Sequence, residues 1–232
     1  MTKPLAIVTG ARKGIGRHLA RHLVERGYRV VGCSRQPDED LCQDYEHRIA
    51  DVTDEAQVVA LFAAVRRQYG APAVLVNTAG VAAMNHALLT PATAIERILR
   101  TNVLGTILAS RECAKLMIAQ RFGRIVNFSS VAVPMQLEGE AVYAASKGAV
   151  ETFTRVLARE LGPMGITVNA IGPAPTDTDL TRSVPPEKIQ ALIGRLAVAR
   201  EGTMEDVANV VDFLIRPESS AVTGQTIYLG GP

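Results

Sequence analysis

The stretch Leu5-Ala6-Ile7-Val8-Thr9-Gly10-Ala11-Arg12-Lys13-Gly14-Ile15-Gly16 decides the fold. Its first five residues form an apolar run that reads as a short buried strand. A glycine loop follows at once and leads into residues 15–26, where apolar side chains recur with helical spacing. A glycine loop placed between a strand and the start of a helix predicts a turn that binds a ligand.

The three glycines of this loop have different predicted tasks. Gly10 permits a tight turn, Gly14 lets a pyrophosphate approach the backbone, and Gly16 allows close helix packing. The free N–H groups at the start of the helix favour an anion. We therefore predict a dinucleotide cradle. A glycine-rich turn without function is the alternative, because the spacing is G-x-x-x-G-x-G and not G-x-G-x-x-G.

Strands and helices alternate along the rest of the chain, with no linker, repeat or low-complexity segment between them. Apolar strands that alternate with helices predict a parallel sheet covered on both faces, with ligands beyond the carboxyl ends of the strands. The predicted fold class is α/β: one Rossmann-like domain over residues 1–232, with a doubly wound parallel sheet of about seven strands. The predicted strands are 5–9, 28–34, 48–50, 73–77, 124–128, 166–171 and 225–229, and the predicted helices are 15–26, 55–69, 94–121 and 141–161.

The composition suits one α/β domain of ordinary size. The chain has 232 residues, 47% of them hydrophobic, and a formal net charge of +2. Scattered cations and an aromatic content of 4% argue against a nucleic-acid surface. Cys33, Cys42 and Cys113 form no metal-binding or redox spacing, the chain opens with a strand and not a leader, and no apolar run reaches about 18 residues. We expect a cytoplasmic protein with no metal, nucleic-acid or membrane partner.

Tyr143 and Lys147 stand four residues apart in a predicted helix, so their side chains share one face. A cation near a phenol lowers the tyrosine pKa from about 10 towards working pH, where proton transfer is most effective. The pair therefore indicates acid–base chemistry. Alone, the same spacing also occurs by chance on surface helices, with the lysine solvated and the ring half buried.

Four motifs together resemble the short-chain dehydrogenase/reductase family over residues 5–231. They are the glycine loop 9–16, Asn77-Thr78-Ala79-Gly80, Ser130 thirteen residues before the tyrosine, and Tyr143-x-x-x-Lys147. The resemblance implies an oxidoreductase that interconverts a carbonyl and a secondary alcohol by hydride transfer. Within the family the chain is most similar to 3-oxoacyl-[acyl-carrier-protein] reductases, through residues 123–127, 165–170 and 223–231.

The resemblance assigns catalytic roles to four residues. Tyr143 is implied as the general acid that protonates the carbonyl oxygen, and Ser130 as a hydrogen-bond donor to that oxygen. Lys147 is implied to lower the Tyr143 pKa and bind the nicotinamide ribose, and Asn102 to hold a water that resupplies the proton. Taken singly, Ser130 could instead satisfy backbone at a strand end, and Asn102 could be a buried amide bonded to a neighbour. Ser129 should face the other side of its strand.

The end of the second predicted strand indicates the cofactor. NAD-preferring family members usually carry an acid there, whereas this chain has Ser34 followed by Arg35. Arg35 and Lys13 can bond the 2′-phosphate of NADP, so the resemblance implies NADP(H); the alternative leaves both cations solvated. The implied cofactor-binding residues are Gly10, Arg12, Lys13, Gly14, Ile15, Gly16, Ser34, Arg35, Asp51, Val52, Asn77, Ala79, Gly80, Tyr143, Lys147, Pro173, Ala174, Thr176 and Thr178.

Ala174 departs from the family pattern, in which a glycine usually follows the proline at position 173. Its methyl stands where the nicotinamide normally passes, so we expect a negative φ or a small backbone shift. Thr176 replaces a usual aliphatic residue near the carboxamide, whereas Thr178 keeps the hydroxyl expected to bind it.

The substrate side is mixed in character. By resemblance, residues 82–89 and 131–140 line it and residues 180–200 form a lid. An apolar pocket is suggested by Met84, Met135, Leu137 and Val142, and a hydroxylated or charged substrate by His86, Gln136, Glu138 and Glu140.

The leading substrate is a 3-oxoacyl thioester carried by acyl carrier protein or coenzyme A. A sugar, polyol or other small ketone is the alternative, and a non-catalytic dinucleotide-binding protein is a third. Arg121 and Arg124 provide basic residues at the turn before the fifth strand, but Met164 occupies the second turn where carrier-dependent relatives are basic. A carrier-protein partner is therefore left open.

Two helices carry apolar residues beyond one core-facing stripe, which predicts a second buried face. By resemblance these helices form one two-fold interface and the last strand another, which implies a homotetramer, or a homodimer if one interface forms. The alternative places all of these residues in the core of a monomer. The residues are Val103, Leu104, Ile107, Leu108, Leu116, Met117 and Ile118 on the first helix, and Val150, Phe153, Val156 and Leu157 on the second.

Overall fold

The described strands form one parallel sheet in the order β3-β2-β1-β4-β5-β6-β7. The structure is a computed structural model that describes residues 3–38, 43–179 and 181–232, so Cys42 and Leu180 lie outside it. The strands are β1 (Leu5–Thr9), β2 (Arg29–Ser34), β3 (Tyr45–Ile49), β4 (Val74–Asn77), β5 (Gly123–Phe128), β6 (Ile166–Gly172) and β7 (Thr226–Tyr228). The predicted doubly wound sheet is confirmed.

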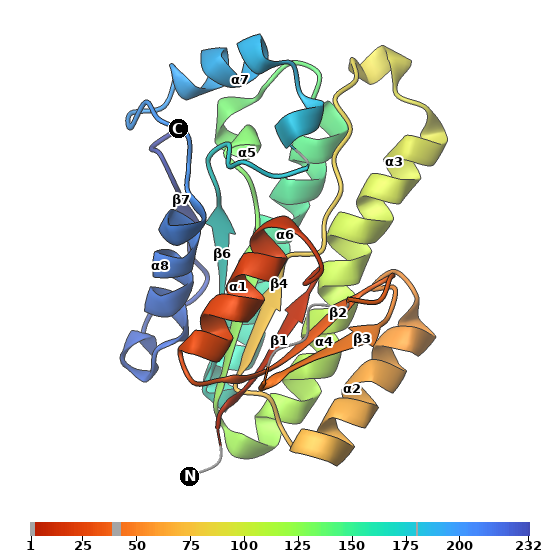
Figure 1. Cartoon of the computed structure of the whole chain (residues 1–232), viewed down its shortest axis with the longest axis vertical. Helices are drawn as coiled ribbons and strands as arrows, with labels where there is room; N and C mark the ends of the chain where they lie inside the picture. Colours follow the sequence, from red (N-terminus) through yellow and green to blue (C-terminus); the bar gives the residue numbers. More distant parts are fainter. Residues whose placement is uncertain (1–2, 39–42, 180) are drawn as a thin grey trace.

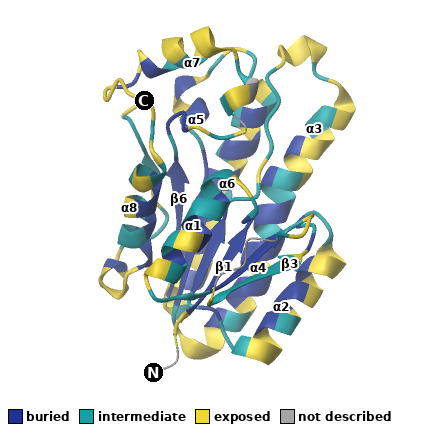
Figure 2. Ribbon diagram, in the orientation of Figure 1, coloured by how far each residue is buried: buried dark blue, intermediate teal, exposed yellow. Residues whose placement is uncertain are grey.

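Helices cover both faces of the sheet (Figure 1). One face packs against α1 (Gly14–Glu25) and α8 (Met204–Ile215), and the other against α2 (Glu55–Tyr69), α4 (Gly105–Met117) and α6 (Ala141–Leu161). Buried residues are concentrated in the strands and on the inner helix faces, as Figure 2 shows. The shorter helices are α3 (Ala92–Leu99), α5 (Ala132–Met135) and α7 (Pro186–Ile193).

The position of β1 between β2 and β4 determines where a ligand can bind. The chain runs outward from β1 to β3, returns to β4 and continues outward to β7. Ligands of doubly wound sheets bind at such a switch point, beyond the carboxyl ends of the strands. The glycine loop after β1 and the 77–80 turn after β4 therefore lie at the same edge.

Two predicted elements differ from the observed ones by more than one residue at an end. The third strand was predicted at 48–50, but β3 begins at Tyr45, where it pairs with Val30, and ends at Ile49. The single helix predicted at 94–121 is divided into α3, a π-helical turn at Arg100–Leu104, α4 and a 3-10 turn at Ile118–Gln120. The π-helical turn changes the helical register and carries Asn102.

Helix α8 was not predicted, although its sequence contains a start signal. Thr203 accepts a hydrogen bond from the Asp206 N–H, and the Asp206 carboxylate accepts one from the Thr203 N–H. This capping box precedes apolar residues that cover the sheet, including Val207 and Val211. In the described part of the chain, none of the helices has the length and apolar character needed to span a membrane.

Candidate active site and cofactor cradle

The glycine loop has the geometry that its spacing predicted. Gly10 has φ +69°, and a Cβ there would lie 2.8 Å from the backbone Cα of Ala79. A Cβ on Gly16 would lie 2.5 Å from the carbonyl oxygen of Gly10, so this position accepts only glycine without a shift. Gly14 has φ +51°, and a Cβ there would come no closer than 3.4 Å, to the Thr178 methyl. The prediction of a tight turn at Gly10 and close packing at Gly16 is confirmed.

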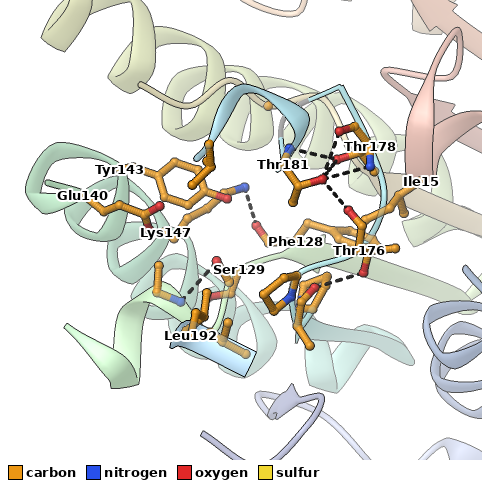
Figure 3. A pocket seen from close by; sticks show the side chains of 18 of the residues that line it. Ile15, Phe128, Ser129, Glu140, Tyr143, Lys147, Thr176, Thr178, Thr181 and Leu192 are labelled. Atoms are coloured by element: carbon orange, nitrogen blue, oxygen red, sulfur yellow. Dashed lines mark hydrogen bonds between the residues drawn. The ribbon is translucent and has the colours of Figure 1, made fainter. Parts of the chain in front are cut away.

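Three of the four predicted catalytic residues meet at one pocket. Tyr143 and Lys147 reach it side by side from α6 (Figure 3). Ser130, two residues after the end of β5, also lines it. Ser130 Oγ accepts from the Ala132 N–H over 3.2 Å, and the Ser130 hydroxyl also lowers the pKa of Tyr143 against the larger effect of burial. The Lys147 ammonium donates to the Phe128 carbonyl over 2.8 Å and lies 5.7 Å from the centre of the Tyr143 ring.

Burial dominates the acid–base properties of this pair. It raises the pKa of Tyr143 to about 12, against the lowering effect of the Ser130 hydrogen bond and together with the nearby Glu140. Burial also lowers the pKa of Lys147 to about 8. The prediction that Lys147 brings the tyrosine pKa below its ordinary value is therefore wrong for the chain as it stands, because both groups lose water and the ammonium is turned to a carbonyl.

Asn102 is buried on the π-helical turn, and its amide is fully engaged by protein atoms. Its Oδ1 accepts from the Val81 N–H over 2.8 Å, and its Nδ2 donates to the Val81 carbonyl over 2.9 Å and to Ser146 Oγ over 3.0 Å. A Cβ on Gly80 would lie 3.4 Å from Asn102 Oδ1 and 3.5 Å from Lys147 Nζ, so both side chains border Gly80. The amide holds the 80–81 backbone in place, and a role in proton resupply stays a prediction.

Asn77 lies beneath the cradle and not within it. Its amide donates to Ser110 Oγ and to Asn127 Oδ1, each over 2.9 Å, and its side chain is buried. Thr78, from the same turn, donates to the Thr9 carbonyl and so joins β4 to β1. These contacts fix the turn, whose Thr78 and Gly80 line the pocket, whereas Ala79 packs against the core.

Ser34 ends β2 and Arg35 follows it, and binding of the 2′-phosphate by Ser34, Arg35 and Lys13 stays a prediction. The Ala11 N–H donates to the Cys33 carbonyl over 3.2 Å and holds the glycine loop against this strand end. Lys13 forms an exposed ion pair with Asp179 over 2.8 Å, and Arg35 is exposed.

Asp51 and Val52 follow β3 along the chain. Val52 is buried, and a Cβ on Gly105 would clash with its side chain. Asp51 Oδ1 accepts from the Thr53 N–H over 2.9 Å and so shapes the turn.

The segment after β6 crosses the pocket opposite Tyr143. Ala174 is buried and is not among the residues with positive φ, which confirms the expected backbone conformation. Thr176 is buried and donates back to the Ala174 carbonyl over 2.9 Å. Thr178 is hydrogen-bonded to Thr181, whose hydroxyl lies 2.7 Å from the Thr176 carbonyl. Figure 3 shows these three threonines gathered on one side of the pocket.

Ser129 borders the same pocket, but its hydroxyl is engaged by α6. Its hydroxyl donates to Glu151 of α6, which also accepts from Tyr228 over 2.5 Å. Sequence reasoning did not identify Glu151, Tyr228 or the Phe128 carbonyl as part of the site's support. A backbone carbonyl and a bridge between distant elements leave no local sequence signal.

A family model described as Enoyl-(Acyl carrier protein) reductase matches residues 10–231. The chain belongs to the short-chain dehydrogenase/reductase family. It is 33% identical to the 3-oxoacyl-[acyl-carrier-protein] reductase FabG of Vibrio cholerae, over 98% of this chain and 96% of the relative. This membership makes the protein an oxidoreductase.

Two solved structures of this reductase family share the whole architecture. Aldohexose dehydrogenase of Thermoplasma acidophilum, in ligand-free form, superposes with a TM-score of 0.90 at 33% identity, covering 99% of this chain and 93% of that one. A variant of actinorhodin polyketide ketoreductase with NADPH gives a TM-score of 0.90 at 32% identity, covering 99% and 96%. Family membership therefore rests on both sequence and fold.

The substrate side of this family member is mostly apolar. The side chains that line it include Val131, Leu137, Val184 and Leu192, with Glu140 as the acidic exception. His86 instead caps the 3-10 turn Ala87–Leu89. Met135, predicted for the apolar wall, packs in a small core cluster with Ala174 and Leu196. Met84, Gln136, Glu138 and Val142 are likewise not among the described residues that line this pocket.

The predicted lid contains a 3-10 turn at Thr181–Ser183 and helix α7. Val184, Ile189 and Leu192 from this region line the pocket. No cluster of His, Cys, Asp and Glu in the described ranges could hold a metal ion.

Proposed function

We propose that this protein is an NADP(H)-dependent reductase that interconverts a 3-oxoacyl thioester and the corresponding 3-hydroxyacyl thioester. The observation that carries the proposal is the junction of Ser130, Tyr143 and Lys147 with an apolar wall formed by Leu137 and Leu192. The first three suit a carbonyl that becomes an alcohol, and the wall suits an acyl chain.

The cradle fits a dinucleotide. Gly14 is open to the pocket side, the α1 N-terminus has no side-chain cap, and both features favour a pyrophosphate. Ser34, Arg35 and Lys13 would take the adenosine ribose and its 2′-phosphate, because no carboxylate occupies position 34. The related ketoreductase structure with NADPH supports this choice of cofactor.

The mechanism assigns one task to each side chain. When bound, a reduced nicotinamide would supply the hydride for the carbonyl carbon. Tyr143 donates its phenolic proton to the carbonyl oxygen, and Ser130 donates a hydrogen bond that stabilises the charge developing there. With its pKa near 12, Tyr143 carries this proton throughout the neutral range. Lys147 stabilises the phenolate left behind while the ammonium is charged, below about pH 8.

The form in which the thioester arrives depends on the carrier. Arg121 lies at the turn before β5 and donates to the Pro163 carbonyl over 2.9 Å, beside the turn that contains Met164. Arg124 is buried and donates to the carbonyls of Gly123 and Pro217, so the expectation that it serves a carrier surface is wrong. At these two turns Arg121 is then the exposed basic residue that remains, which suits a coenzyme A thioester at least as well as a protein carrier.

A hexose or polyol dehydrogenase is the second candidate function. The aldohexose dehydrogenase fold match favours it, and Glu140 places a carboxyl group in the pocket that could bind a hydroxyl. Burial raises the pKa of Glu140, and the apolar residues around it offer few further partners for a polyhydroxylated substrate.

The substrate is tested by following NADPH oxidation with acetoacetyl-CoA, a longer 3-oxoacyl thioester, a diketone and a keto-sugar. The proposal predicts the highest kcat/KM for a 3-oxoacyl thioester. A Glu140→Gln variant adds a control, because it should lower sugar turnover and leave thioester turnover nearly unchanged. Faster turnover of the keto-sugar, lost in Glu140→Gln, would favour the second candidate.

A further inference from the structure

A chain of hydrogen bonds through the buried side chain of His47 lies behind Ser34, and the function proposed above gives it no task. His47 of β3 is its centre. The His47 Nε2 lies 2.9 Å from Ser34 Oγ and 3.1 Å from the Gln36 carbonyl, and its Nδ1 lies 2.8 Å from the Tyr45 hydroxyl. Asp38 Oδ2 lies 4.0 Å from the same Nδ1.

The network is enclosed, although it ends at a partly exposed residue. The side chains of His47 and Asp38 are 2% and 5% exposed. Ser34, at the end of β2, is less buried and donates to the Gln36 carbonyl over 2.7 Å. His47 is thus one hydrogen bond away from the position that we assign to the ribose phosphate.

The hydrogen bonds can be satisfied in two protonation states. The Gln36 carbonyl only accepts, so Nε2 carries a hydrogen in both. With neutral His47, Tyr45 donates to Nδ1. With charged His47, Nδ1 donates to the Tyr45 oxygen, and the Tyr45 hydrogen turns to Asp38, with which its hydroxyl also shares a hydrogen bond.

To donate to a phosphate, Ser34 must release the Gln36 carbonyl, and Nε2–H is close enough to take that acceptor over in both states. The charged state differs by its positive charge, which lies directly behind Ser34 and would stabilise a phosphate there.

We propose that His47 is a proton-responsive positioning residue for the 2′-phosphate of the nucleotide, so that the preference for NADPH over NADH increases as the pH falls. This inference rests on the proposed cofactor. His47 would bind a proton as NADPH binds, and it would not do so with NADH, which lacks the phosphate.

The groups around His47 set the direction of its titration. Burial lowers the pKa of His47 from its ordinary value, and Arg12 of the glycine loop lowers it further, whereas the Gln36 carbonyl and Asp38 raise it. Tyr45 in turn faces Asp38, the buried Cys33 of β2 and Arg17 of α1. The pKa of His47 therefore lies below its ordinary value in the free protein, and a phosphate dianion nearby would raise it and favour the charged form as the pH falls.

The test measures NADPH and NADH dissociation constants at pH 6 and pH 8 for wild type and His47→Gln. Glutamine can still donate to Gln36 or Ser34, but it does not titrate. The 2′-phosphate itself has a second pKa of about 6 and loses charge as the pH falls, an effect that both proteins share. We expect the preference for NADPH over NADH to rise from pH 8 to pH 6 by at least about threefold more in the wild type than in His47→Gln. If NADPH binding raised the pKa of His47 by one unit, the rise would approach about tenfold.

Two controls and one variant-free measurement complete the design. His22→Gln removes another histidine, paired with Asp212 over 2.9 Å, and should leave the wild-type profile unchanged. Arg35→Ala should weaken NADPH binding by a similar factor at both pH values. Calorimetry of the wild type in two buffers of different ionisation enthalpy measures the protons taken up on binding. More protons should be taken up with NADPH than with NADH, and this difference should be larger in the wild type than in His47→Gln, where only the phosphate titrates.

Coincident pH profiles of wild type and His47→Gln, with NADPH binding intact, would overturn the role of His47 and leave the proposed cofactor standing. If His47→Gln does not fold, the wild type alone decides: equal proton uptake with NADPH and with NADH would overturn the role of His47. Absence of NADPH binding at both pH values would overturn the cofactor proposal and this inference together.

Discussion

Lys147 is a buried ammonium whose hydrogen bond goes to the carbonyl of Phe128 and not to a carboxylate. A buried charge without a counter-charge lowers the stability of the folded protein, and such a charge is kept where function needs it. Burial lowers its pKa from 10.5 to about 8. The folded chain therefore binds fewer protons than the unfolded chain between about pH 8 and pH 10.5, so its stability rises with pH in that window.

Lys147→Met should consequently abolish turnover and raise the free energy of unfolding at pH 7 by about 1–3 kcal/mol. The gain over wild type should shrink between pH 8 and pH 10.5, as the wild-type ammonium loses its proton. Urea denaturation at pH 7 and at about pH 10 measures both effects. Lys115→Met, which removes an exposed lysine of α4, should show no such gain. A less stable Lys147→Met at pH 7 would contradict the account of burial.

The site residues were predicted with uneven success, and the reason is physical. Motif spacing identified the Tyr143, Lys147 and Ser130 junction and the cradle glycines, because helical and strand geometry determine those positions. It did not show that burial outweighs the cation in the pKa of Tyr143. Motif spacing also did not show whether the Asn77 amide bonds to buried protein groups or to a ligand, because the same side chain can do either.

At the scale of elements, α8 shows how a short local signal starts a helix that covers the sheet. Thr203→Ala removes the side-chain acceptor of the capping box, so it should lower the free energy of unfolding by about 1 kcal/mol. Denaturant unfolding checks this value. Thr152→Ala, at an exposed position within α6, is the matched control and should change stability less. Equal effects of the two substitutions would argue against a stabilising cap.

The prediction of elements was accurate where apolar periodicity is strong and failed where a change of register interrupts it. Residues 94–121 read as one helix because apolar residues continue through both halves. The π-helical turn that separates α3 from α4 places Asn102 against Val81 and Ser146, contacts made by residues distant in sequence. Short elements such as α5 have too few residues for periodicity to register.

At the scale of the whole molecule, the two predicted interface helices divide into core and uncovered residues. Leu108, Met117, Val150 and Leu157 are buried within the chain. Others are only partly covered, and Ile118 and Val156 are 40% and 51% exposed. The partly covered or exposed set is Val103, Leu104, Ile107, Leu116, Ile118, Phe153 and Val156, with the small Ala145 and Ala149 beside it on α6.

We propose that this apolar face of α4 and α6 packs on a second copy of the chain, and that β7 forms a second interface in a homotetramer. Light scattering coupled to gel filtration at micromolar concentration should then show a tetramer. A dimer would support one interface only, and Val156→Glu should dissociate it if that interface is the α4 and α6 face. A monomer peak for wild type would refute the assembly.

In the proposed carbonyl reduction Tyr143 donates the proton to the substrate oxygen, and a Tyr143→Phe variant removes that proton while keeping the ring. Steady-state NADPH oxidation with the best 3-oxoacyl thioester should fall at least about 100-fold, while the NADPH dissociation constant stays near the wild-type value, because only the transferable proton is lost. Turnover within a few-fold of wild type by Tyr143→Phe, with NADPH binding intact, would contradict it.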